Sequence, residues 1–130
     1  MEFLLEAVSV TKRFGGFTAL DGLDISISDG ERLGLIGPNG SGKTTFINCV
    51  SGALKNDSGA IKFRGGEISK LAAHKRIRLG IARSFQIPKP FKSMTVRENL
   101  LIPYEFGVQA FKSKLAKTPD EVLSLMGLHD

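Results

Sequence analysis

One stretch of this chain restricts its possible folds more than any other: "LGLIGPNGSGKTT", residues 33–45. Its apolar start, residues 33–36, predicts a strand that leads directly into a glycine-rich loop. From Lys43 the spacing changes to that of a helix, which Gly52 is placed to end. The apolar face of this predicted helix consists of Phe46, Ile47 and Val50. A strand, a loop and a helix in immediate succession predict a mixed α/β fold.

The loop itself matches G-x-x-x-x-G-K-[ST] over residues 37–44. Glycines let successive backbone N–H groups point at phosphate oxygens, and the dipole of the following helix favours the same anion. Lys43 can then reach the β- and γ-phosphates, and the Thr44 hydroxyl can bind Mg²⁺. The alternative is a glycine turn with an incidental lysine, but the strand before and the helix after favour a phosphate site. The predicted binding residues are Gly37, Pro38, Asn39, Gly40, Ser41, Gly42, Lys43, Thr44 and Thr45.

The rest of the chain divides into two segments, residues 1–86 with mixed patterns and residues 87–130, which are mainly helical. In the second segment, Thr95 with Glu98 and Thr118 with Glu121 have capping-box spacing, so each pair predicts a helix start. Further elements are predicted as strands at residues 3–10, 23–28, 59–63 and 80–85, and as a helix at residues 69–79.

Composition favours a soluble cytoplasmic domain. The net charge of +5 suits an anionic partner without selecting one, and the single Cys49 excludes an internal disulfide. No apolar run approaches the roughly 18 residues needed to cross a bilayer, and the N-terminus lacks the basic start of a signal peptide. The basic run at residues 70–78 is not interleaved with aromatic residues, so no nucleic-acid partner is expected.

Two longer stretches resemble ATP-binding subunits of ABC transporters. The first runs from "VTKRFGG" through the glycine loop to "SGAIKF", and the second is "GIARSFQIPKPFKSMTVRENLL". The second is similar to the branch that serves importers of branched-chain amino acids, urea and related solutes. The resemblance covers roughly residues 5–102. It implies a P-loop NTPase core of α/β class, with an N-terminal antiparallel β part and the start of an α-helical subdomain, as an incomplete domain.

The resemblance also assigns roles to residues outside the loop. Phe14 would stack on adenine, with Phe17 as a competitor for that role; the alternative is a phenylalanine packed into the core. Gln86 would approach Mg²⁺ and the attacking water, which adds it to Lys43 as a catalytic residue and to Thr44 as a metal ligand. Without the resemblance, Gln86 would be an ordinary solvated side chain. Residues 86–102 would contact transmembrane permease subunits.

Several parts of an ATP-hydrolysing site are missing from the sequence. No carboxylate follows a run of four aliphatic residues, and there is no "LSGGQ"-like motif or switch histidine. We therefore expect the N-terminal half of an ATPase that couples ATP hydrolysis to solute import, on the inner face of the membrane and paired with a second ATP-binding subunit. This half would bind ATP and Mg²⁺ without efficient hydrolysis. The alternatives are a nucleotide-binding regulatory or scaffold module and a non-transport ABC ATPase.

Overall fold

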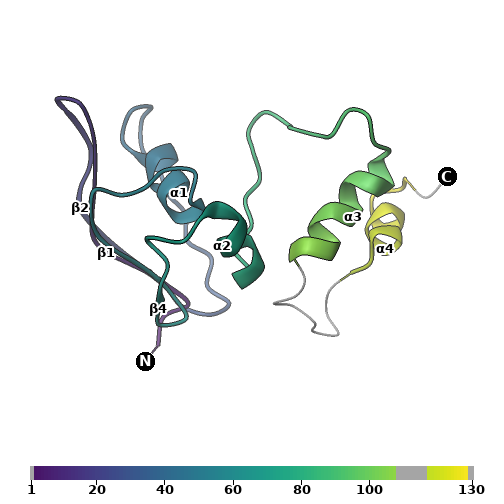
Figure 1. Cartoon of the computed structure of the whole chain (residues 1–130), viewed down its shortest axis with the longest axis horizontal. Helices are drawn as coiled ribbons and strands as arrows, with labels where there is room; N and C mark the ends of the chain where they lie inside the picture. Colours follow the sequence, from purple (N-terminus) through teal and green to yellow (C-terminus); the bar gives the residue numbers. More distant parts are fainter. Residues whose placement is uncertain (1, 108–116, 129–130) are drawn as a thin grey trace. The chain divides into compact units, whose positions relative to one another are not determined.

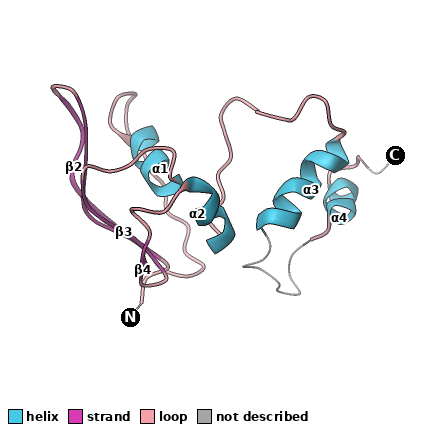
Figure 2. Ribbon diagram, in the orientation of Figure 1, coloured by secondary structure: helices cyan, strands magenta, loops and turns pink. Residues whose placement is uncertain are grey.

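The computed structural model of this chain describes residues 2–107 and 117–128 (Figures 1 and 2). These residues form two compact units, Met1–Ala73 and His74–Asp130. The first unit combines a sheet with one helix, and the second is helical. Together they confirm the predicted α/β class with an antiparallel β part followed by helices.

The sheet of the first unit has four antiparallel strands in the order β2-β1-β3-β4. The strands are β1 (Leu5–Phe14), β2 (Phe17–Ile27), β3 (Ser58–Phe63) and β4 (Gly66–Glu67). β1 continues beyond the predicted end at residue 10, because the chain reverses only at the next two glycines. Gly15 has a φ of 57°, which the tight two-residue turn between β1 and β2 requires.

β1 is interrupted by a bulge at Ser9. Ser9 has a φ of 49°, and its N–H donates to Asp24 Oδ1 at 2.7 Å. The register of β1 shifts here against both of its neighbours, between Ala7 and Val10 on the β2 side and between Val8 and Thr11 on the β3 side. Bulges of this kind re-aim the residues that follow them. The end of β1 is the part of the strand that reaches the candidate site.

Helix α1 (Lys43–Ser51) supplies the helical part of the core, and Gly52 ends it in the left-handed conformation, as predicted. Phe46 and Cys49 are the buried residues of α1, whereas Ile47 is 37% exposed. The buried face of the helix therefore includes Cys49 in place of Ile47, which was predicted to belong to it. The buried apolar residues of the first unit come from the sheet, from α1 and from the turn after β4: Ala7, Val10, Leu20, Phe46, Cys49, Ile61 and Ile68.

Two predicted strands, residues 33–36 and 80–85, do not form. A strand of this apolar kind is stable when neighbouring strands satisfy its backbone and cover both of its faces. Within the described residues, the sheet contains only β1–β4. Each run accordingly leaves a large apolar side chain exposed, Ile36 by 99% and Phe85 by 49%.

The second unit consists of α2 (Ala73–Leu79, whose first residue belongs to the first unit), α3 (Val96–Gly107) and α4 (Pro119–Leu125). α2 is shorter than the predicted helix at residues 69–79. None of the helices in the described ranges is both long enough and apolar enough to span a membrane. Part of the predicted helical segment, residues 108–116 and 129–130, lies outside the described residues.

Both predicted capping boxes are confirmed. Before α3, the Thr95 N–H donates to Glu98 Oε2 at 2.6 Å, and the Glu98 N–H donates to Thr95 Oγ1 at 3.1 Å. The backbone hydrogen bond from Thr95 holds the pKa of Glu98 below its usual value. Thr118 and Glu121 make the same reciprocal pair before α4. An Arg97–Asp120 ion pair at 2.9 Å joins α3 to α4.

Candidate nucleotide-binding site

The glycine loop is built around two glycines in the left-handed region, Gly40 with a φ of 85° and Gly42 with a φ of 96°. Gly42 is also the residue immediately before α1. A Cβ at this position would lie 2.7 Å from the Ala19 carbonyl oxygen and 3.0 Å from Leu20 Cδ2. Because both the φ and the space exclude a side chain, glycine at position 42 lets the loop approach β2 this closely.

The start of α1 is open to an anion. No side chain caps this helix, and its first turn contains no acidic residue. Helix N-termini of this kind present N–H groups and the positive end of the helix dipole. Lys43 reaches back over the loop, where its Nζ donates to the carbonyl oxygens of Gly37 and Pro38, the latter at 2.9 Å, and to Ser41 Oγ at 3.2 Å. The ammonium group is therefore held above the loop.

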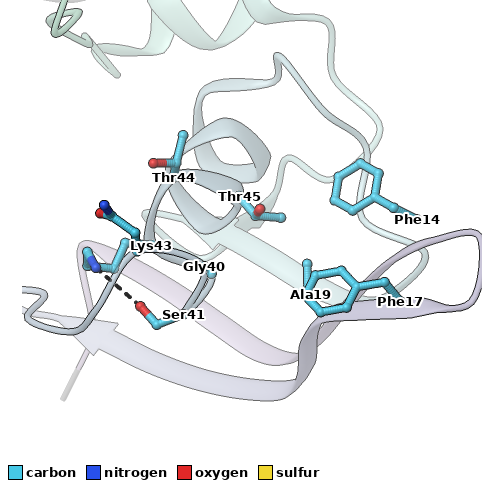
Figure 3. A pocket seen from close by; sticks show the side chains of 10 residues that line it. Phe14, Phe17, Ala19, Gly40, Ser41, Lys43, Thr44 and Thr45 are labelled. Atoms are coloured by element: carbon cyan, nitrogen blue, oxygen red, sulfur yellow. Dashed lines mark hydrogen bonds between the residues drawn. The ribbon is translucent and has the colours of Figure 1, made fainter.

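A cavity of about 300 Å³ lies between this loop and the β1–β2 hairpin. Its lining residues are Phe14, Phe17, Ala19, Asn39, Gly40, Ser41, Gly42, Lys43, Thr44 and Thr45. Figure 3 shows Lys43, Ser41 and Thr44 at one end and the two phenylalanine rings at the other, with Thr45 between them. The lining includes one cation and no carboxylate, which suits an anionic group at one end and a flat apolar group at the other.

The two phenylalanines come together because Phe14 and Phe17 are directly paired across the hairpin turn. Paired residues on neighbouring antiparallel strands project from the same face of the sheet. Phe14 is 46% exposed and Phe17 is 59% exposed, so neither is the core phenylalanine of the alternative interpretation. Ala19 follows Phe17 on the same face of β2 and also lines the cavity. Sequence reasoning missed Ala19, although the alternation along this strand could have indicated it.

The remaining predicted residues are placed differently. Gly37 and Pro38 do not line the cavity, but their carbonyl oxygens hold the Lys43 ammonium. Gln86 is exposed and belongs to the second unit, in an irregular segment, so its catalytic and metal-binding roles stay predictions. No group of three or more histidine, cysteine, aspartate or glutamate side chains in the described residues could hold a metal ion.

Comparison with known proteins shows the family of this chain. The sequence profile of the family described as "ABC transporter" matches residues 20–130, which is most of the chain. The chain belongs to the ABC transporter family.

Two relatives indicate the branch of this family. The chain is 48% identical over 111 residues to a "Probable branched-chain amino acid transport ATP-binding protein LivG" from Archaeoglobus fulgidus, covering 85% of this chain and 43% of the relative. It is 40% identical over 117 residues to "High-affinity branched-chain amino acid transport ATP-binding protein BraF" from Pseudomonas aeruginosa, covering 89% of this chain and 46% of the relative. The chain thus spans less than half the length of these relatives.

Solved structures of ABC cassettes have the same fold. A crystal structure of the ADP conformation of an ATP-binding cassette of an ABC transporter aligns with a TM-score of 0.77 at 36% identity, over 99% of this chain and 55% of that one. A nucleotide-free ATP-binding cassette from an ABC transporter aligns with a TM-score of 0.75 at 37% identity, over 98% of this chain and 55% of that one. The fold of this chain is therefore part of an ABC ATPase domain.

Proposed function

We propose that this chain binds MgATP in the cavity between the glycine loop and the β1–β2 hairpin. The observation that carries the proposal is the Lys43 ammonium, held by carbonyl oxygens of the loop at an uncapped helix start, in the lining of a cavity that includes no carboxylate. The loop N–H groups and Lys43 would hold the phosphates, and the Thr44 hydroxyl would bind Mg²⁺. Bound Mg²⁺ would neutralise phosphate charge. One of the two phenylalanines would stack on the base.

We further propose that the intact protein is the ATP-binding subunit of an importer of branched-chain amino acids or similar solutes. The names of the two relatives support this solute class. In such an importer, residues 86–102 would contact the transmembrane permease subunits, and the protein would act as a dimer on the inner face of the membrane. Three exposed apolar residues of this segment, Ile87, Phe91 and Val96, suit a protein contact.

Solute uptake in the organism that encodes the chain tests this proposal. Deleting the gene should abolish high-affinity uptake of radiolabelled leucine, isoleucine and valine, because the permease loses its energy source. The intact gene should restore uptake, and the same gene with Lys43→Ala should not. Unchanged uptake of all three amino acids in the deletion strain would contradict the assignment to this solute class.

The 130-residue chain alone should show no measurable ATP turnover. Hydrolysis needs a carboxylate behind Mg²⁺ and a group that positions water, and no carboxylate lines the described cavity. We expect phosphate release by the purified chain to equal that of its Lys43→Ala variant. Phosphate release clearly above that of the variant would contradict the proposal that this chain binds ATP without hydrolysing it. It would mean that the chain itself supplies the carboxylate and the group that positions water.

A further inference from the structure

The end of β1 is held by Asp57, the residue immediately before β3. The Asp57 N–H donates to the Thr11 carbonyl oxygen at 2.8 Å, and its Oδ2 accepts from the Arg13 N–H at 2.6 Å. The last pair in the ladder between β1 and β3 is Thr11 with Ser58. The hydrogen bonds of Asp57 therefore attach β1 to this side of the sheet beyond the end of the ladder. On its other side, β1 shifts register against β2 between Lys12 and Arg13. Asp57 thus fixes the backbone where the β1–β2 ladder is irregular.

The Asp57 carboxylate also faces a lysine. Its Oδ1 lies 3.6 Å from Lys12 Nζ, and the Lys12 side chain is only 15% exposed. The hydrogen bond from the Arg13 N–H, together with the nearby charges of Lys12 and Arg13, holds the pKa of Asp57 below its usual value. Asp57 is therefore an anion at neutral pH and a fixed partner for the Lys12 ammonium.

Lys12 in turn contacts one of the two phenylalanines of the cavity. Its Nζ lies 5.4 Å from the centre of the Phe14 ring, within the range of a cation–π interaction. Phe14 lines the cavity and Lys12 does not. The lysine therefore contacts the Phe14 ring without being part of the cavity wall. No cation in the described part of the chain lies over the Phe17 ring, which is also the more exposed of the two.

We propose that Lys12, anchored by Asp57, is a positioning residue that makes Phe14, rather than Phe17, the ring that stacks on the base of the bound nucleotide. This inference rests on the proposed MgATP site. A ring that is already held in place loses less conformational freedom when the base binds. A lysine near the ring face also withdraws electron density from it, which favours stacking on the electron-rich purine. Phe17 would form the outer rim of the cavity.

The test compares two ligands by calorimetry: MgATP, which has a base, and magnesium tripolyphosphate, which has none. The measured quantity is the ratio of their affinities, which we call the base preference. Phe14→Ala should lower the base preference about tenfold, the size expected for the loss of one stacked base, and Phe17→Ala should leave it unchanged. Lys12→Met, which keeps the stem and removes the charge, should lower it about threefold.

Three further variants separate positioning from simple charge. Lys12→Arg keeps the cation and should keep the base preference, and Asp57→Asn should lower it. Lys70→Met removes the same charge from an exposed loop of the same unit and should have no effect. A role of Lys12 as a general positive charge would weaken both ligands equally and leave the base preference intact, which would overturn the inference. So would a loss of base preference in Phe17→Ala but not in Phe14→Ala.

Fluorescence gives a second readout, because the chain contains no tryptophan. In Phe14→Trp, MgATP should quench the emission and tripolyphosphate should not. Without ligand, the fluorescence anisotropy of Phe14→Trp should fall when Lys12→Met is added; an unchanged anisotropy would contradict the positioning role. Failure of the MgATP site itself would look different: the wild-type chain would bind neither ligand, and the inference would fall with the site.

Discussion

Lys43→Ala is expected to weaken MgATP binding by this chain about 100-fold, or ~2.7 kcal/mol. Lys43 is the one cation among the residues that line the cavity. Its ammonium is already held over the loop by hydrogen bonds to the Pro38 carbonyl oxygen and to Ser41 Oγ. A hydrogen bond between charged groups contributes about 1.5–3 kcal/mol, and alanine removes both the charge and the donors. The affinity is measured by calorimetric titration of the purified chain.

The matched control is Lys70→Ala, which removes the same charge from an exposed position of the same unit. Its effect on MgATP affinity should be less than about twofold, because exposed charges are screened by salt. Circular dichroism should show the same helix and sheet content in both variants and in the wild type. Equal MgATP affinities of Lys43→Ala and the wild-type chain would contradict the assignment of the phosphate-binding end of the cavity.

Gly59→Ala is expected to destabilise the first unit by about 3 kcal/mol or more. Gly59 has a φ of 80°, and a Cβ there would lie 2.3 Å from the Ser9 carbonyl oxygen and 2.5 Å from that of Val8. These contacts are with backbone, so no side chain can move to relieve them. The alanine would push β3 away from the bulge in β1. The measurement is the urea midpoint of unfolding, followed by circular dichroism.

Gly34→Ala serves as the control for Gly59→Ala. The Gly34 φ lies outside the left-handed region, and a Cβ there would meet no atom within 4 Å. The expected change is below about 0.5 kcal/mol. If the two variants unfolded at the same urea concentration, the packing of β3 against the Ser9 bulge would not be a stabilising feature of the sheet.

The glycine loop and the starts of α1, α3 and α4 could be predicted from the sequence because their causes are local. The motif at residues 37–44 fixes which backbone positions are glycine and where α1 begins. A capping box requires only a hydroxyl residue and a glutamate three positions later, and both pairs, at Thr95 and at Thr118, behave as expected. Gly52 ends α1 for an equally local reason, because glycine readily adopts the left-handed conformation that ends a helix.

Features that depend on distant residues could not be predicted in this way. Residues 33–36 and 80–85 have strand-like sequences, but a strand also requires neighbours, which no local pattern supplies. The bulge at Ser9 and the pairing of Phe14 with Phe17 depend on how β1 meets β2 and β3. The sequence therefore indicated two candidate phenylalanines, and only the hairpin register places both at the same cavity.

Nuclear magnetic resonance of the isotopically labelled chain tests directly whether MgATP binds in the glycine loop. We expect MgATP to shift the amide signals of residues 39–45, together with the ring signals of Phe14, in a saturable way. The same titration should leave the signals of α4 in place. Shifts confined to the second unit, or no saturable shift at residues 39–45, would show that this chain does not hold MgATP in its glycine loop.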